Sequence, residues 1–275
     1  MLKVIVILLI SGLIIVGILA YPVWIAQRRK RLKRRPFPPL WSAVVAKHLP
    51  IYARLSSAER RRLQGHMQIF LAEKQFIGCQ GLQITEEMKL VIAAIACLLL
   101  LNERGKYFPK LRSILVYPGA YLVNEITAID NFVVEERQEA RLGESWTRDQ
   151  VVLSWEQVKQ DTRNWRDGRN VVLHEFAHQL DQEDGKAEGV PVLQQNADYS
   201  TWTKVMTAEY QQLCQNVERG AKTVIDRYGA TNPAEFFAVA TETFFEKPFQ
   251  LLKRHPALYE QLQRYYQLEP RQWAD

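Results

Sequence analysis

The sequence is poor in cysteine and in histidine. Its three cysteines, Cys79, Cys97 and Cys214, are odd in number, widely spaced and form no Cys-x-x-Cys pair. Such a set excludes a disulfide framework and indicates a reducing compartment. We expect Cys97, which lies in an apolar run, to be inert core, and we assign no redox or zinc role to any of the three. Only five of the 275 residues are histidines, so two of them at metal-ligand spacing form a specific signal.

Positive charge is scarce outside one short segment. The formal net charge is +6, but seven of the 36 basic residues lie within residues 28–35, and one more is Lys3. The remaining 28 basic residues stand against 30 acidic ones, so the rest of the chain is slightly acidic. It has no basic face of the kind that binds nucleic acid, and we expect no direct nucleic-acid binding.

Charge is absent from a long N-terminal run. Residues Val4 to Ala26 are uncharged and nearly all aliphatic, with Tyr21 and Trp24 near the end. The run is long enough to span a bilayer, and the aromatic residues suit the interface. We predict a single-pass transmembrane anchor at residues 1–27, with the N-terminus outside and the body on the cytoplasmic side, where cations are retained. A cleaved secretory signal is the alternative, but the run exceeds the usual length of about 7–15 residues and a basic block follows it.

Residues 28–39 are predicted to form a basic and proline-rich linker. The cations give way to Pro36, Pro38 and Pro39, which resist regular structure and would space the body from the membrane. The basic run could also contact anionic lipid headgroups. An equally good interpretation is that it is a topology signal only.

Caps and hydrophobic periodicity predict the elements of the body, residues 40–275. Early helices are expected from Leu40, after Ser56 or Ser57, and after Thr85; the last contains the apolar run Leu90–Leu101, which is too short for a membrane span and suits a buried core helix. Short β-branched segments predict strands at Ser113–Pro118, Asn131–Val134 and Gln150–Trp155. Later helices are expected through Trp202–Leu213, from Asn232, and over Leu251–Leu268.

Two further expectations concern parts of this body. An edge strand of the small sheet could pair with an extended peptide through main-chain hydrogen bonds. His48 and His66 lack metal-ligand spacing, and we interpret them as partly buried surface histidines.

The stretch Asn170–Asp181 contains candidate metal-ligating and catalytic residues. It contains His-Glu-x-x-His, with His174 and His178 four residues apart. On a helix these two side chains lie on one face, so both imidazoles can bind one ion, while Glu175 beside them can act as a general base without ligating it. Zinc in hydrolases takes three protein ligands and keeps one position for water. Asn170 suits the N-cap of this helix and Gly185 its end.

Two glutamates further along the chain are candidates for the third metal ligand. Asn232 and Pro233 mark a helix start, and Glu235 and Glu242 lie seven residues apart on one face of that helix. From spacing alone either could complete the metal shell, and Glu235 could instead cap the helix start. Asp181, on the histidine face, is either a group that orients a ligand histidine or a solvated acid.

Three segments together resemble a known family. They are Asn170–Asp181, Tyr228–Glu242, and Leu71–Lys74 with Gly81 and Leu82. They are similar to the zinc-dependent peptidase family of Mlc titration factor A, over roughly Phe37 to Pro270.

The resemblance implies a fold, site roles and a partner. The fold is a gluzincin type of zincin, which gives an α+β, mostly helical metallopeptidase domain with a small β-sheet, preceded here by one transmembrane helix. It implies that His174, His178 and Glu235 are the zinc ligands, Glu175 the general base, and Tyr228 the residue that steadies the transition state. The family name implies binding of a glucose-regulated transcriptional repressor.

The sequence therefore predicts a zinc metallopeptidase tethered to the cytoplasmic face of a membrane and acting on peptides or proteins. An aminopeptidase is one form that this activity could take. The alternative is a regulatory binding module that sequesters a transcriptional repressor, with a structural or vestigial zinc site.

Overall fold

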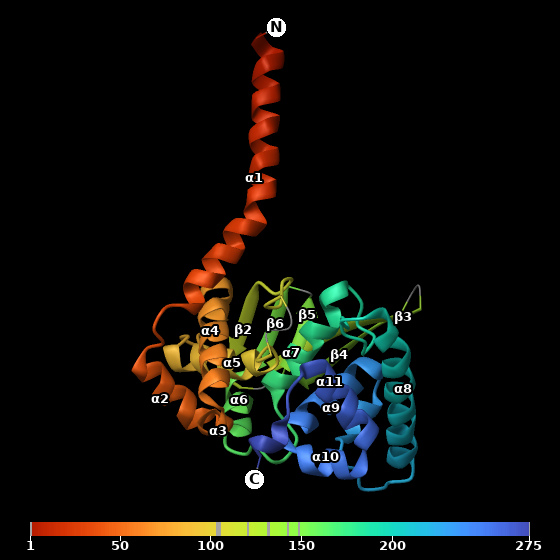
Figure 1. The fold of residues 1–275 in the computed structure, drawn as a ribbon. Coiled ribbons are helices and arrows are strands. Elements are labelled where there is room, and N and C mark those ends of the chain that lie inside the picture. Colours follow the sequence, from red (N-terminus) through yellow and green to blue (C-terminus); the bar gives the residue numbers. More distant parts are fainter. Residues whose placement is uncertain are drawn as a thin grey trace.

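One long helix stands out from a mostly helical body built around a small sheet (Figure 1). The computed structural model describes residues 2–102, 106–119, 121–130, 133–141, 143–147 and 149–274. The expected α+β class, mostly helical with a small sheet and one apolar N-terminal helix, is confirmed.

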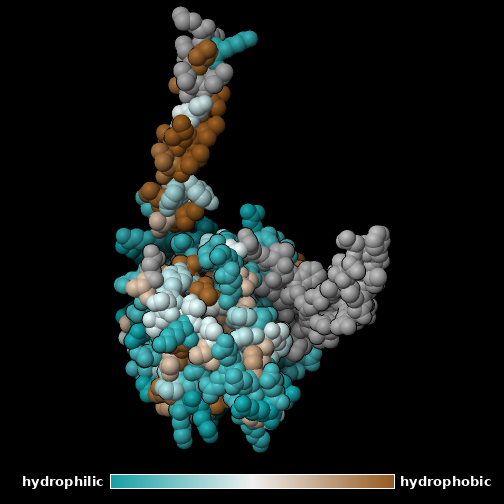
Figure 2. Space-filling model, turned by 90° about the vertical axis from the view of Figure 1, so that its right-hand side faces the viewer, coloured by the Kyte–Doolittle hydropathy of each residue, from teal (hydrophilic) through white to brown (hydrophobic). Residues whose placement is uncertain are grey.

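Helix α1, Leu2–Lys33, contains the apolar run and most of the basic run. Its segment Leu9–Lys33 is long and apolar enough to cross a membrane. Figure 2 shows the exposed apolar side chains of this helix in brown, above a largely hydrophilic body. Residues 28–33 of the predicted linker continue this helix, and the segment between α1 and the next helix is residues 34–38. Pro36 is the first residue there that cannot continue a helix, and packing holds the preceding turns in place.

The base of α1 is docked on helix α4, Ser57–Glu73. Arg29 donates two hydrogen bonds to the Glu73 carboxylate, at 2.9 and 2.7 Å, and its guanidinium lies 4.7 Å from the centre of the Tyr107 ring. Leu32 is buried, and Gln68 donates hydrogen bonds to the backbone carbonyls of residues 35 and 36. The helix therefore joins the body through specific contacts.

Local caps set the early helices. Ser56 and Thr85 each accept a hydrogen bond from the backbone N–H three residues later, as expected. These caps open α4 and α5, Glu86–Leu98; two shorter helices precede them, α2 (Pro39–His48) and α3 (Ile51–Arg54). Contrary to expectation, His66 of α4 is buried, and the Tyr107 ring packs against it with its hydroxyl 3.0 Å from His66 Nδ1.

The main sheet has the strand order β1-β2-β6-β5. Its strands are β1 Gln75–Gly78, β2 Ser113–Tyr117, β5 Gly143–Thr147 and β6 Gln150–Ser154; the first three in the order run parallel and β5 is an antiparallel edge. The strands predicted at Ser113 and Gln150 are confirmed, whereas β1 and β5 were not predicted.

A separate hairpin pairs β3, Tyr121–Asp130, with β4, Val133–Arg141. The strand predicted at Asn131–Val134 corresponds to the start of β4, and Asn131 and Phe132 lie outside the described residues.

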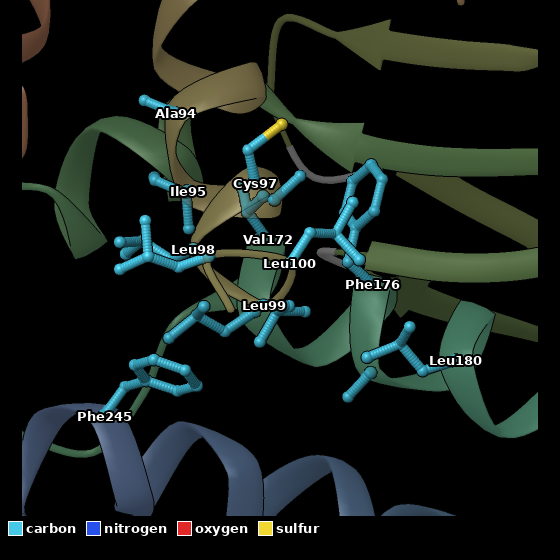
Figure 3. Close-up of a cluster of buried hydrophobic side chains, with 14 of the residues drawn as sticks. Ala94, Ile95, Cys97, Leu98, Leu99, Leu100, Val172, Phe176, Leu180 and Phe245 are labelled. Atoms are coloured by element: carbon cyan, nitrogen blue, oxygen red, sulfur yellow. The ribbon is translucent and has the colours of Figure 1, made fainter. Parts of the chain in front are cut away.

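Helices α5 and α7, Val171–Asp181, pack together over the sheet and form the centre of the core. Figure 3 shows Leu98 at the end of α5, and Leu100 just after it, gathered with Val172 and Phe176 of α7 and Phe245 of α9, Pro233–Glu246. All five side chains are buried, and each large apolar side chain of this kind contributes about 1.5–3 kcal/mol on burial. The helix that carries the two histidines is thus fixed on its apolar side.

The C-terminal half wraps this core with helices. They are α6 Trp155–Asp161, η1 Gln182–Asp184, α8 Asn196–Glu218, η2 Arg227–Ala230, α10 Pro248–Arg254, α11 Pro256–Tyr266 and η3 Pro270–Gln272. The single helix expected over Leu251–Leu268 is wrong: Pro256 pushes the residue before it out of helical conformation and starts a second helix.

Replacing Glu73 with Gln should loosen the base of α1 without unfolding the body. The change removes the charge-assisted bonds from Arg29, which are worth about 1 kcal/mol at this partly exposed site. A helical backbone must unfold locally to enter a protease, so trypsin cleavage within residues 28–35 of the full chain in detergent should speed up about fivefold once this contact is weakened.

A matched control for this experiment is Glu260→Gln on α11, which removes an exposed pair with Arg264. It should leave the cleavage rate unchanged. A Glu73→Gln protein cleaved at the wild-type rate would show that the pair does not hold the helix.

Candidate metal centre

Helix α7 begins at a cap and shows its polar face to α9. The Asn170 side chain accepts a hydrogen bond from the Leu173 N–H, and Gly185, with φ of 108°, closes the short η1 turn after the helix. Leu173, Phe176 and Ala177 are buried in the core. His174 and His178 therefore point to the opposite side, where α9 lies.

Three donor atoms meet between α7 and α9. The Nε2 atoms of His174 and His178 are 3.2 Å apart. A carboxylate oxygen of Glu235 lies 3.0 Å from the first and 3.4 Å from the second. Among the described residues, these three are the group that could hold a metal ion.

The triangle has the dimensions of a zinc site. Zinc lies about 2.0–2.2 Å from histidine nitrogen and carboxylate oxygen, so two ligands of a tetrahedral ion are about 3.3 Å apart. The three edges, 3.0, 3.2 and 3.4 Å, match that spacing. The residues therefore fit zinc in both donor type and separation.

The electrostatics of the centre favour a positive charge. Burial by itself would lower the pKa of His174, but the Glu242 and Glu235 carboxylates raise it well above its ordinary value. Burial would likewise raise the pKa of Glu235, but its hydrogen bonds with His174 and His178 hold it below the usual range. The carboxylates thus stabilise a cation at this point, either a proton on an imidazole or a metal ion.

Glu242 lies behind His174 and not at the triangle. One of its oxygens is 2.7 Å from His174 Nδ1, and the other accepts the backbone N–H of Asn170. An Nδ1–H directed at Glu242 leaves the Nε2 lone pair facing Glu235 and His178. Glu235 therefore lies beside the two Nε2 atoms and Glu242 does not, a difference that the sequence spacing of the two glutamates did not show.

Glu175 and Tyr228 lie near the triangle. Glu175 is 3% exposed on α7. Tyr228 is half exposed in the η2 turn, and its ring centre is 5.9 Å from that of His174. Asp226 fixes this turn, because it accepts the Tyr228 N–H and pairs with Arg169.

The interpretation of Asp181 as a solvated acid is wrong. It is buried, and its two oxygens accept the N–H groups of Gly189 and Val190. A side chain at Gly189 would collide with the carbonyl of Pro233 at the start of α9. Asp181 therefore ties the loop after α7 against the helix start that carries Glu235.

A set of buried carboxylates at the start of α7 was not predicted. Glu246 accepts the N–H groups of Gly168 and Arg169 and the side-chain amide of Asn170, and Asp161 accepts the Val171 N–H. A signal for Glu246 was present, because it lies four residues after Glu242 on the same face of α9.

Comparison with known proteins relates nearly the whole chain to one family. A family model described as glucose-regulated metallo-peptidase M90 matches residues 24–267. An uncharacterized protein of Synechocystis sp. is 50% identical over 262 residues, 94% of this chain and 95% of its own. Mlc titration factor A of Klebsiella pneumoniae is 32% identical over 235 residues, 84% of this chain and 87% of its own. The protein of that name from Yersinia pestis is 32% identical over 230 residues, covering 82% and 83% of the two chains.

Glu246 should make the stability of the protein depend on pH. Burial raises its pKa to about 10, and the neighbouring acids Asp167 and Glu242 add to the shift. An unfolded glutamate has a pKa of about 4.3, so between these values the folded state holds a proton that the unfolded state has lost, and stability falls as pH rises. Glu246→Gln should remove this slope, so its stability relative to wild type should increase with pH, by at most about 1.4 kcal/mol per unit.

Thermal unfolding of the full chain in non-ionic detergent between pH 5 and 9 measures this difference. Glu246→Ala is the companion variant: it also lacks the titrating group, but it leaves the buried N–H groups without this acceptor, so it should be about 1–3 kcal/mol less stable than Glu246→Gln at every pH. A constant difference between wild type and Glu246→Gln across the range would contradict the raised pKa.

Proposed function

This chain belongs to the family of glucose-regulated M90 metallo-peptidases, and on that premise we propose that it hydrolyses peptide bonds with a zinc ion held by His174, His178 and Glu235. The observation that carries the proposal is the triangle of donor atoms with edges of 3.0, 3.2 and 3.4 Å. Two imidazoles and one carboxylate leave the fourth position of a tetrahedral ion for water or substrate, which is the donor set of a catalytic site.

The surrounding side chains supply the acid–base chemistry. A zinc ion bound there would lower the pKa of a water molecule to about 7 and polarise the peptide carbonyl. Glu175 accepts the proton of the attacking water and then delivers it to the leaving amine. Tyr228 donates its hydroxyl hydrogen to the carbonyl oxygen as negative charge develops there. Glu242 holds His174 in the tautomer that presents Nε2.

The substrate lies along the edge of the sheet in this proposal. Strand β5 is an edge strand and contacts α7, the helix of the centre. An extended peptide can pair with the free side of such a strand through main-chain hydrogen bonds, which would hold a scissile bond beside α7. Peptides with a free or a blocked N-terminus would separate an aminopeptidase from an endopeptidase.

Regulatory binding is the second candidate, and the name of several relatives favours it. Those relatives are called Mlc titration factor A, a name that refers to titration of the protein Mlc. In this case the chain would sequester a transcriptional repressor, and the zinc site would be structural or vestigial. The two candidates differ in one measurement, because a binding module shows no hydrolysis with zinc bound.

The membrane placement completes the proposal. Helix α1 would cross the membrane once with its N-terminus outside, and the cations of residues 28–35 would keep the body in the cytoplasm. A reporter fused after Asp275 tests this orientation, since activity of that reporter outside the cytoplasm would reverse it.

Glu175→Gln should abolish hydrolysis while zinc and fold remain. The amide keeps the size of the side chain but cannot accept the proton of water, and one acid–base group accounts for a factor of about 10²–10⁴ in rate. We expect a loss of that size in kcat, with one zinc per chain by elemental analysis. Full activity in the zinc-loaded variant would remove Glu175 from the mechanism.

Glu235→Ala and Glu242→Ala should weaken zinc binding to different degrees. Loss of Glu235 removes a ligand atom from the triangle, so zinc affinity should fall severely. Loss of Glu242 leaves the ligands in place but removes the acceptor of His174 Nδ1, which should lower affinity by about 10–100-fold. Competition with a chelating dye measures both. The reverse order would exchange the roles of the two glutamates.

A further inference from the structure

A polar pocket of about 720 Å³ lies among three segments: the backbone that leads into α7, the loop between α8 and η2, and the end of α9. Six charged side chains line it: Asp167, Arg169, Lys222, Asp226, Arg227 and Lys247. A pocket of this volume has room for one or two amino-acid residues of a bound peptide.

The pocket adjoins the candidate metal centre. Arg169 on its wall pairs with Asp226, which accepts the backbone N–H of Tyr228 at 2.9 Å. The ring of Tyr228 in turn faces that of His174. A peptide that lies across His174 and passes Tyr228 therefore reaches the mouth of the pocket within a residue or two.

Positive charge dominates the lining. Four cationic side chains stand against two carboxylates, and Asp226 is already engaged by Arg169 and lies beside Arg227. Among the described residues, neither Lys222 nor Lys247 forms an ion pair, whereas Arg169 is paired with Asp226. A pocket with unneutralised cations attracts an anionic group.

Lys247 is held in place by the backbone before α7. Gly168 has a φ of +75°, and a methyl group added there would lie 3.1 Å from both Cδ and Nζ of Lys247. The lysine side chain thus lies across this glycine, and its half-buried stem fixes the ammonium group at the pocket wall. A cation fixed in advance loses less conformational freedom when it binds an anion.

We propose that this pocket binds a carboxylate of the peptide substrate, either the side chain of a glutamate or aspartate or a free C-terminus. The inference rests on the proposed peptidase function and adds the substrate class to it. Lys222 and Lys247 contact the carboxylate, and Arg169 and Arg227 contribute to the positive field. The enzyme then prefers peptides that place a negative charge at one fixed distance from the scissile bond.

The test uses the full-length protein in detergent with zinc and a set of quenched fluorescent peptides. The peptides differ at one position at a time, which is Glu, Gln, Ala or Lys, on both sides of the cleaved bond; a second set ends in a free acid or an amide. Gln is the matched control, because it has the shape of Glu without the charge. We expect kcat/KM to be about tenfold higher for Glu than for Gln at one position, or for the acid over the amide, and the two arms distinguish the sources of the carboxylate.

Variants that change the charge of the pocket then assign the preference to it. Lys222→Glu in the exposed loop reverses a charge, and Lys247→Met removes one while keeping the apolar stem; each should reduce the Glu-over-Gln ratio about threefold to tenfold while the rate on the Gln peptide changes less. Lys253→Glu, on the exposed face of α10, is the control with the same change of charge as Lys222→Glu and should leave the ratio unchanged.

The possible outcomes distinguish a failure of the carboxylate pocket from a failure of the proposed peptidase function. If no peptide is hydrolysed, the peptidase function itself fails. If peptides are hydrolysed with equal efficiency for Glu and Gln at every position, or if Lys253→Glu reduces the preference as much as the pocket variants do, the peptidase stands and the carboxylate pocket is wrong.

Discussion

The antiparallel contact between α7 and α9 sets the geometry of the centre. Three glutamates on one stripe of α9 meet successive parts of α7: Glu246 meets the backbone before it, Glu242 meets Asn170 and one imidazole, and Glu235 meets both imidazoles. Because the stripe repeats after seven and four residues, it stays on one face and fixes the register of the two helices. A slip by one turn would separate these buried carboxyl groups from their partners and place them against apolar surface, where an unsatisfied polar group costs about 2–7 kcal/mol.

Features with local signals could be predicted from the sequence. Each cap depends on a side chain and a backbone N–H three residues away, so the helix starts follow from short stretches of sequence: Ser56, Thr85, Asn170 and Asn232. The spacing of His174 and His178 likewise determines that they share a face once a helix forms. The mostly helical class and the family follow from the sum of such signals and from the motifs.

Features that depend on distant partners could not be predicted. Strand β1 has only four residues, and its conformation comes from pairing with β2, almost 40 residues later. The basic residues that end α1 pack against α4, where Arg29 donates hydrogen bonds to Glu73, and these contacts stabilise their helical conformation. The burial of Asp181 depends on a loop that returns to it, and the contact of Glu246 joins residues 77 apart. Local sequence patterns do not show which of these distant residues will meet in the folded chain.

The docked base of α1 limits how the body can move relative to that helix. A flexible tether would let the body rotate freely and sample solution on every side of its attachment point. Here the basic turns are clamped to α4 by Arg29 and Glu73, so the orientation of the body follows that of the helix. If this helix is inserted in a bilayer as proposed, the protein diffuses in two dimensions and the candidate metal centre stays at one height above the lipid. Effective concentration then rises for peptide segments presented at that height by membrane-bound proteins, and not for peptides free in solution.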